Sequence, residues 1–434
     1  ETGRNDARAL LELAQRLPDE PALMIDALLE QPGVGSIQER EELERGMELA
    51  QQALDLSRQL GDAHREMRAL MALTNLYNLR SDPAWRWTGQ QALELARRLG
   101  DRRAEVTILL QLGGAYGPDD LENSMACLQA ALSIATDLHD KSAEIRLLSA
   151  LGTQLARQGD YYRYLTEIEE KRLQLSREIG DRYAEGGALM NCGQIRGLWL
   201  GDYAAGLALE EEALGIWENI TGRVYPLLRI AQLHTEMGNY DAALEVLAQA
   251  QPVGEREVRD MGRAGLGLVS AILFNALGDE AHLRQALDSA GWVYRLAADS
   301  LVSQQYRMAA LCEIAFAHLR LAELAAAPDE QQQHRREALD ASGAAFDLYQ
   351  GFGFVQIVEC TSEEILFRHG LVLQANGQTE AGQDMVRRAY AEMRRKHALI
   401  PADSPFSQTY LEAIPLHREI RAAYEALPAP GAAS

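Results

Sequence analysis

Four stretches of the sequence share one pattern: an apolar residue, then Gly-Asp (His-Asp in the third), and a glutamate four residues after the aspartate. They read LGDAHRE at 60–66, LGDRRAE at 99–105, LHDKSAE at 138–144 and IGDRYAE at 179–185. A glycine ends a helix at low cost because it adopts the left-handed conformation. The aspartate can accept hydrogen bonds from the free amides of the next helix, and the glutamate suits the positive end of that helix dipole. Each stretch therefore predicts the end of one helix and the start of the next.

A second kind of turn lies half a repeat away from the first. It reads Gly159-Asp160-Tyr161, Gly201-Asp202-Tyr203, Gly238-Asn239-Tyr240 and Gly278-Asp279-Glu280. The segments between the two kinds of turn are amphipathic and about 16–20 residues long, as expected of helices. Two alternating turns at a regular spacing predict a repeating helical hairpin.

Length and composition agree with a repeat architecture. At 434 residues the chain exceeds the ~250–300 residues at which a single core stops growing, whereas a stack of repeats buries each apolar face on its neighbour. Good helix formers (Ala, Leu, Glu, Arg and Gln) dominate the composition. We therefore predict an all-α fold, a superhelical solenoid of about nine helical hairpins with capping helices.

The regularity of the pattern divides the chain into four predicted segments. Residues 1–18 contain a start without methionine, read as a cloning scar on a piece of a longer protein, and one helix. Residues 19–298 hold seven regular hairpins, the first of which contains a loop at 31–36. Residues 299–400 hold two less regular hairpins, the first broken by a polar insert at 328–333. Residues 401–434 form a capping helix, at about 406–427, and a disordered tail.

The spacing of small residues resembles that of the tetratricopeptide repeat (TPR). Gly152 stands seven residues before Gly159, and Ala231 and Ala271 stand seven before Gly238 and Gly278. Gly193 fills the same place with one extra residue before its turn. The period near 40 exceeds the usual 34 or so. Long repeats of this kind resemble the TPR region of bacterial signal-transduction ATPases with numerous domains (STAND proteins, including the maltose-regulon activator) and that of animal spindle-orientation adaptors. The arginine-rich composition favours the bacterial group.

The resemblance also implies a binding surface. In a TPR superhelix the first helix of each hairpin lines the concave groove, and five motif positions point into it. Carried onto this chain, the ligand-binding candidates are Arg68, Asn75, Asn78, Arg146, Ser149, Thr153, Arg157, Gln194, Tyr225, Gln232, Glu236 and Asn275. This set is polar and more positive than the whole chain, whose net charge is −22. It would suit an anionic or hydroxyl-rich ligand, or an extended peptide bound through its backbone. The alternative for each residue is a solvated groove position without a ligand.

The sequence contains no recognisable catalytic motif, which predicts a protein that is not an enzyme. No Gly-Lys-Ser/Thr loop, complete G-x-G-x-x-G, nucleophile elbow or His-Glu pair occurs, and the nine histidines show no close ligand spacing. We expect no catalytic residue, metal site or cofactor. Trp85-Arg86-Trp87 is read as a hydrophobic plug between hairpins, with an exposed aromatic anchor as the alternative.

These observations predict a TPR sensor that binds a protein, peptide or small-molecule inducer in its groove and controls an N-terminal STAND ATPase or effector of the parent chain. The alternative is a static adaptor that scaffolds protein partners. The acidic charge argues against nucleic acid, and no apolar run reaches the ~18 residues of a membrane span. The four cysteines are far apart in sequence, which favours free thiols in a reducing cytoplasm.

Overall fold

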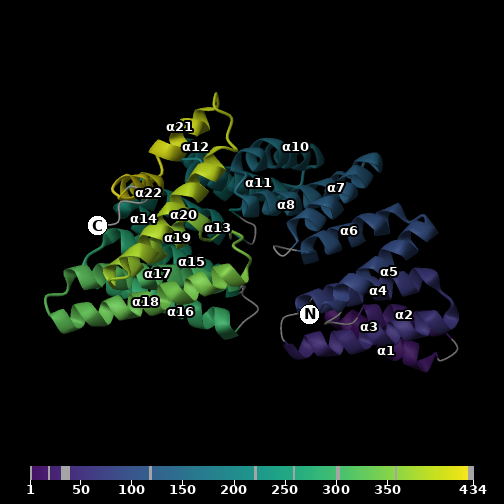
Figure 1. Ribbon diagram of the computed structural model, residues 1–434. Coiled ribbons are helices and arrows are strands. Elements are labelled where there is room, and N and C mark those ends of the chain that lie inside the picture. Colours follow the sequence, from purple (N-terminus) through teal and green to yellow (C-terminus); the bar gives the residue numbers. More distant parts are fainter. Residues whose placement is uncertain are drawn as a thin grey trace. The chain divides into compact units, whose positions relative to one another are not determined.

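The computed structural model describes residues 2–17, 20–30, 40–116, 120–218, 222–257, 260–299, 304–356 and 359–428. These residues are helices and connecting turns, and no strand occurs among them (Figure 1). Consecutive helices within each unit pack in pairs, as in the hairpins α4–α5, α6–α7, α15–α16, α17–α18 and α19–α20. The predicted all-α, TPR-like solenoid of hairpins is confirmed.

The chain divides into two compact units, which are described separately. Unit 1 covers Glu1–Gln154 and unit 2 covers Leu155–Ser434, so the boundary falls inside the predicted array 19–298. The helices that lie in or begin in unit 1 are α1 (Thr2–Arg16), α2 (Pro21–Leu29), α3 (Arg40–Leu60), α4 (Ala63–Leu79), α5 (Ala84–Leu99), α6 (Arg102–Tyr116), α7 (Leu121–Asp137) and α8 (Lys141–Gln158).

Unit 2 contains the remaining helices, two of which include a π-helical segment (η). In chain order they are α9 (Tyr161–Arg163), η1 (Tyr164–Glu169), α10 (Glu170–Ile179), α11 (Arg182–Gln194), η2 (Ile195–Trp199), α12 (Tyr203–Ile216), α13 (Val224–Glu236), α14 (Tyr240–Glu257), α15 (Asp260–Leu277), α16 (Glu280–Asp299), α17 (Gln304–Leu324), α18 (Pro328–Gly351), α19 (Ser362–Ala375), α20 (Thr379–His397), α21 (Pro405–Glu412) and α22 (Pro415–Glu425).

The first kind of turn has the predicted geometry. Gly61, Gly100 and Gly180 have positive φ angles, and His139, which replaces glycine in the third stretch, has φ 54°. The aspartates that follow them accept hydrogen bonds from backbone amides three residues on, at 2.9–3.0 Å; they are Asp62, Asp101, Asp140 and Asp181. The structure adds a feature that the sequence analysis missed. In three of the stretches an arginine eight residues before the glutamate pairs with it, as in Arg97–Glu105 at 2.8 Å, Arg58–Glu66 at 2.9 Å and Arg177–Glu185 at 2.9 Å.

The second kind of turn is also confirmed, since Gly159, Gly201, Gly238 and Gly278 all have positive φ. The structure explains the one extra residue between Gly193 and its turn. It coincides with η2, where the wider π-helical turn accommodates one residue more than an α-turn. The hairpin can therefore keep the small residue Gly193 against Glu210 of α12, where an added Cβ would lie 2.8 Å from the glutamate side chain.

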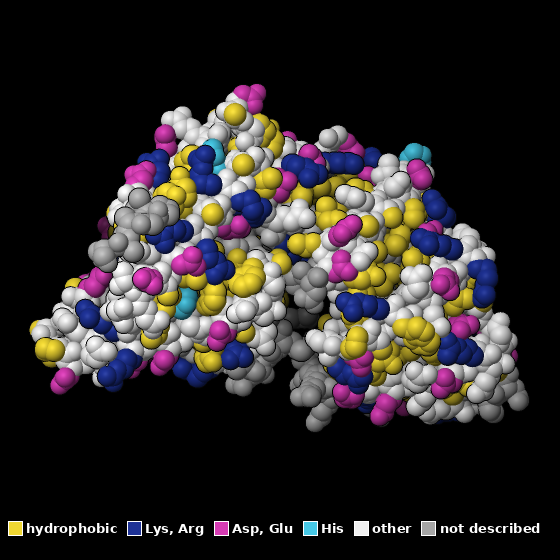
Figure 2. All heavy atoms as spheres, viewed as in Figure 1, with side chains coloured by type: hydrophobic (Ala, Val, Ile, Leu, Met, Phe, Trp, Pro, Cys, Tyr) yellow, Lys and Arg dark blue, Asp and Glu magenta, His cyan; other side chains and the backbone are white. Residues whose placement is uncertain are grey.

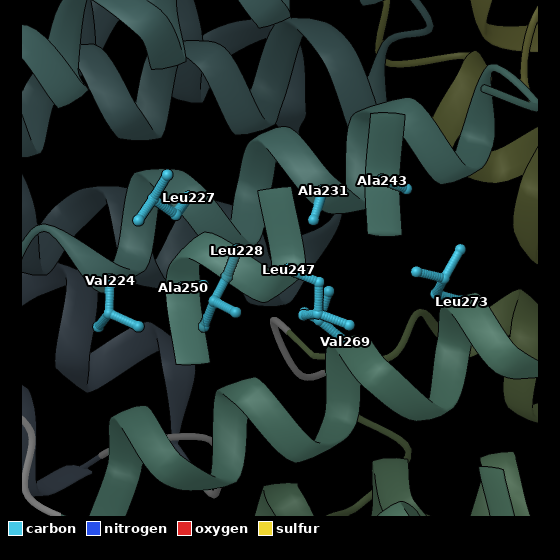
Figure 3. Close-up of a cluster of buried hydrophobic side chains, with 9 residues drawn as sticks. All are labelled: Val224, Leu227, Leu228, Ala231, Ala243, Leu247, Ala250, Val269 and Leu273. Atoms are coloured by element: carbon cyan, nitrogen blue, oxygen red, sulfur yellow. The ribbon is translucent and has the colours of Figure 1, made fainter. Parts of the chain in front are cut away.

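The core runs from one hairpin to the next, as a repeat array requires. One cluster joins α13 and α14 to α15, the first helix of the following hairpin (Figure 3). Its fully buried members include Ala231, at the predicted small position, and Leu273. Ala271, the equivalent small residue of the next hairpin, is also fully buried and belongs to a neighbouring cluster. Small residues at these positions let the paired helices approach closely.

Two local predictions are wrong. Residues 328–333 are not an insert, because they form the first turns of α18, with Pro328 at the favourable first helical position. The predicted capping helix at 406–427 is two helices, α21 and α22, because Pro415 cannot continue α21 and starts α22 instead. The predicted loop at 31–36 and most of the predicted tail (429–434) lie outside the described residues.

The Trp85-Arg86-Trp87 motif separates into two environments. Trp85 is buried and packs edge-on against Tyr116, with ring centroids 5.0 Å apart. Trp87 is 57% exposed. The plug interpretation therefore applies to Trp85 and not to Trp87.

Candidate functional site

Unit 2 contains a cavity of about 660 Å³, a volume typical of small-molecule and peptide sites. Its walls come from the first helices of successive hairpins, α11, α13, α15, α17 and α19, as expected for the inner face of a TPR array. The segment 359–361 and the start of α22 complete the lining. The cavity therefore combines repeat helices with the C-terminal end of the chain.

The C-terminal helices reach the cavity because they pack back onto the beginning of unit 2. Thr409 Oγ1 donates a 2.6 Å hydrogen bond to the carbonyl of Leu200, 209 residues earlier in the chain. Arg395 donates at 2.9 Å to the carbonyl of Gln158, 237 residues earlier. Unit 2 is thus closed on itself by its last helices.

A buried ionic network holds this closure together. The ammonium of Lys396 on α20 is fully buried and pairs with Glu363 and with the side-chain oxygen of Gln356. Gln356 in turn donates to the carbonyl of Ala156 at 2.9 Å and to the hydroxyl of Tyr161 at 2.6 Å. The network therefore links α8 and α9 to α19 and α20.

The second oxygen of Glu363 binds the C-terminal helix. It lies 3.3 Å from Nε2 of His417 on α22. Burial by itself would raise the pKa of Glu363, but Lys396 and His417 more than offset it and lower the pKa to about 2. Glu363 is therefore a carboxylate at neutral pH.

A second set of charged groups crosslinks three of the cavity helices. Arg368 on α19 pairs with Glu313 of α17 at 2.6 Å and with Glu364 at 2.7 Å. Asn275 of α15 donates to the other oxygen of Glu313 at 2.7 Å. Each of these charged groups thus has a partner within the protein, which leaves other groups to face a ligand.

Two glutamates in the lining differ from the rest. Among the described residues, Glu236 forms no hydrogen bond or ion pair, and Oε2 of Glu359 is buried without a hydrogen-bond partner. Burial, reinforced by the charge of Glu364 and opposed by that of Arg368, raises the pKa of Glu236 to about 7. Burial also raises the pKa of Glu359, against the attraction of Arg229. Both side chains are suited to bind a donor or a cation that enters the cavity.

Five predicted groove residues lie in the cavity lining: Gln194, Tyr225, Gln232, Glu236 and Asn275. Gln194 and Asn275 are nearly buried, and Oδ1 of Asn275 has no partner among the described residues. Gln232 accepts a 3.1 Å hydrogen bond from Arg229. The repeat pattern thus predicted residues from three of the cavity helices.

The other predicted groove residues lie outside this lining. They are Arg68, Asn75, Asn78, Arg146, Ser149, Thr153 and Arg157. Arg68 pairs with Asp26 at 2.6 Å and with Glu30 at 3.4 Å, and Thr153 donates to the carbonyl of Ser149 within α8. All except Arg157 belong to unit 1.

The charge of the cavity lining differs from the charge predicted for the groove. Its lining contains six glutamates and four arginines rather than an excess of arginine. On the face shown in Figure 2, acidic and basic side chains are likewise interleaved. Glu359, Arg368 and His417 were not among the predicted groove residues. Arg368 lies on α19, a hairpin to which the groove positions were not extended, and His417 lies on α22, which reaches the cavity only through the closure of unit 2.

The fold and cavity define a TPR-type helical-repeat protein with a cavity lined by both charged and apolar side chains. No protein-family model matches the sequence, and no curated protein matches it. Solved structures of similar fold include the apo form of RapI (TM-score 0.47, 13% identity, 74% of this chain and 95% of that chain). A Rap protein complexed with competence and sporulation factor gives a TM-score of 0.47 at 14% identity, covering 81% of this chain and 99% of that one.

A STAND protein with a tetratricopeptide repeat sensor from Pyrococcus horikoshii is also similar, with a TM-score of 0.43 and 17% identity over 77% of this chain and 54% of that chain. Within the described ranges, no helix combines the length and apolarity needed to cross a bilayer. The four cysteines are free thiols, three of them buried.

Proposed function

We propose that this chain is a non-catalytic sensor region whose cavity in unit 2 binds a short peptide or another small zwitterionic molecule. The proposal rests on two carboxylates in the cavity lining, those of Glu236 and Glu359. Among the described residues, at least one oxygen of each has no hydrogen-bond partner. Oε2 of Glu359 is buried, and a buried carboxylate oxygen without a partner is costly, whereas the half-buried Glu236 faces the same cavity. A ligand ammonium or guanidinium would supply the missing partner.

The same lining offers partners for a ligand carboxylate. Among the described residues, the guanidinium of Arg229 donates only to the neutral amide of Gln232, at 3.1 Å. Arg320 lies 3.6 Å from Glu323, a partner that is 64% exposed. Both arginines therefore retain donors for an anionic group. Opposite charges on the cavity wall favour a ligand that carries both signs, which a peptide with free termini does.

The construction of the cavity supports a regulatory role. A ligand in it would contact helices of several hairpins together with the C-terminal segment, so it would favour the closed arrangement of unit 2 over any more open one. We propose that this preference is read by an ATPase or effector domain of the parent protein, in keeping with the resemblance of the long repeat to STAND proteins. The coding sequence on the N-terminal side is then expected to contain a Gly-Lys-Ser/Thr loop, and a parent without one would contradict the STAND role alone.

A static adaptor remains the second candidate because of Trp87. This side chain is 57% exposed on α5 of unit 1, and exposed tryptophans are frequent anchors at protein interfaces. An adaptor would bind a protein through this surface and would not require the cavity. Substitution of Trp87 by alanine would then abolish partner binding, whereas the sensor function would be unaffected.

The binding proposal is tested by thermal-shift and calorimetric titration of the purified chain with amino acids, short peptides, amines and oligosaccharides. A ligand that binds the folded protein raises its melting temperature. We expect peptides or other zwitterions to do so and neutral oligosaccharides not to. The Glu236→Gln variant should weaken binding about tenfold or more, and the exposed Glu94→Gln in unit 1 is the matched control.

The pKa of Glu236 gives this test a pH signature. Because the carboxyl group ionises near pH 7, the affinity for a ligand with a cationic group should rise between about pH 6 and pH 8. Glu236→Gln should remove that rise. Affinity that is independent of pH, or equally pH-dependent in Glu236→Gln, would count against the role of this residue.

A further inference from the structure

A cluster of two histidines and a glutamate lies on the hairpin of α17 and α18, and none of the three lines the cavity. His318 stands seven residues before Ala325, and His334 stands seven residues after Ala327, on either side of the connecting turn. In an antiparallel hairpin, positions equally distant from the turn face each other, so the two imidazoles meet. Glu337 is one helical turn after His334 and points to the same side.

The three side chains bring their ligand atoms close together. The two Nδ1 atoms are 3.0 Å apart. Oε2 of Glu337 lies 3.1 Å from Nδ1 of His318 and 3.3 Å from Nδ1 of His334. In a tetrahedral zinc site with bonds of about 2.0–2.1 Å, neighbouring ligand atoms are about 3.3–3.4 Å apart. The observed triangle therefore needs to expand by only a few tenths of an ångström to hold zinc.

Hydrogen bonding alone does not explain this arrangement well. If the two imidazoles are neutral, only one Nδ1 can carry the shared proton between them. The other Nδ1, 3.0 Å away, then presents a lone pair, as does the carboxylate oxygen, which lies 3.1 and 3.3 Å from the two nitrogens. Lone pairs that converge in this way repel one another, and a cation bound at their centre turns the repulsion into attraction.

The surroundings of the cluster also suit a metal ion. The histidine side chains are 15% and 11% exposed, whereas that of Glu337 is 40% exposed, so the site is sheltered but open to solvent on one side. Nε2 of Gln333 donates to Oε1 of Glu337 at 3.2 Å, which leaves Oε2 directed at the histidines. Hydrogen bonds of this kind commonly orient metal-binding carboxylates.

We propose that His318, His334 and Glu337 form a zinc site with three protein ligands and a fourth position open to water. Two imidazole nitrogens and one carboxylate oxygen are a ligand set that zinc accepts in tetrahedral geometry. The ion would join α17 to α18 near their connecting turn and so stabilise this hairpin. This site is separate from the proposed ligand cavity, and neither proposal depends on the other.

The test is calorimetric titration of the full chain, without a polyhistidine tag and after chelator treatment, with zinc chloride. One ion per chain is expected, together with a higher melting temperature in zinc. Glu337→Gln and the double variant His318→Gln/His334→Gln should weaken zinc binding at least tenfold. His64→Gln, at an exposed histidine of unit 1, is the control and should bind as the unmodified protein does.

A second measurement needs no variant and so does not depend on a variant's folding. The unmodified protein loaded with cobalt should show the intense visible absorption of a four-coordinate ion. A spectrum like that of hydrated cobalt, an absence of saturable zinc binding, or zinc binding unchanged in the double variant would each overturn the proposal.

Discussion

Turn glycines of the two units illustrate how one sequence feature serves two structural purposes. Gly61 and Gly100 in unit 1 end helices in the left-handed conformation, and among the described atoms nothing lies within 4 Å of where their Cβ would be. Gly159 and Gly201 in unit 2 have the same conformation but lie against the C-terminal helices. An added Cβ would come within 2.8 Å of the Lys396 side chain at Gly159 and within 2.7 Å of the Thr409 carbonyl at Gly201.

The difference shows that turn glycines with the same left-handed conformation can play different tertiary roles. In unit 1 the glycines satisfy only the backbone of their own turn. In unit 2 two of them also accept the helices that close the unit and complete the cavity. Closure, rather than the repeat itself, therefore distinguishes unit 2 and creates its candidate binding site.

The largest expected effect is that of breaking the buried network of unit 2. Lys396→Met leaves Glu363 as a buried carboxylate whose ion pair to the lysine is lost. We expect a loss of about 3–5 kcal/mol in the free energy of unfolding of unit 2, measured by chemical denaturation. Lys171→Met, at an exposed position of α10, is the control. Equal stability of the two variants would show that the network does not hold the closure.

Acid should weaken the same contact gradually. The pKa of Glu363 is lowered from 4.5 to about 2, so its ionised form contributes stability above pH 4.5 and loses that contribution as the pH falls towards 2. The difference in unfolding free energy between the unmodified protein and Glu363→Gln should therefore shrink over this range. A constant difference would contradict the lowered pKa.

The smallest effects concern the turn glycines and test the comparison directly. Gly61→Ala and Gly180→Ala place a side chain in the left-handed region without a clash and should cost about 1–2 kcal/mol. Gly201→Ala adds overlap with the Thr409 carbonyl and should cost about 2–4 kcal/mol. Gly180 is the better control because it belongs to unit 2. If all three variants lose the same stability, the closure does not press on Gly201.

Much of the local structure could be predicted from the sequence because it depends on neighbouring residues. Positive φ at Gly100 and the amide hydrogen bond to Asp101 follow from the conformational freedom of glycine and the reach of an aspartate side chain. The TPR resemblance implied the groove positions of Gln232 and Asn275, and both residues line the cavity. His139 shows the limit of the pattern, since it adopts the turn conformation without being glycine.

The remainder of the candidate site depends on contacts that no local pattern encodes. Glu363 and Lys396 come together across a hairpin, and Gln356 donates to the carbonyl of Ala156, 200 residues earlier in the chain. The pairing of His318 with His334 likewise requires the turn between α17 and α18, and their spacing matches no metal-binding motif.

The sequence by itself determined the helices, their two alternating turns and the repeat, because capping, glycine conformation and apolar periodicity act within a few residues. Only the tertiary structure decided which repeat faces enclose a cavity, and which charges there remain unpaired. Those outcomes depend on how far the array curves before its last helices meet its earlier ones, and small differences in packing add up along the chain to set that curvature.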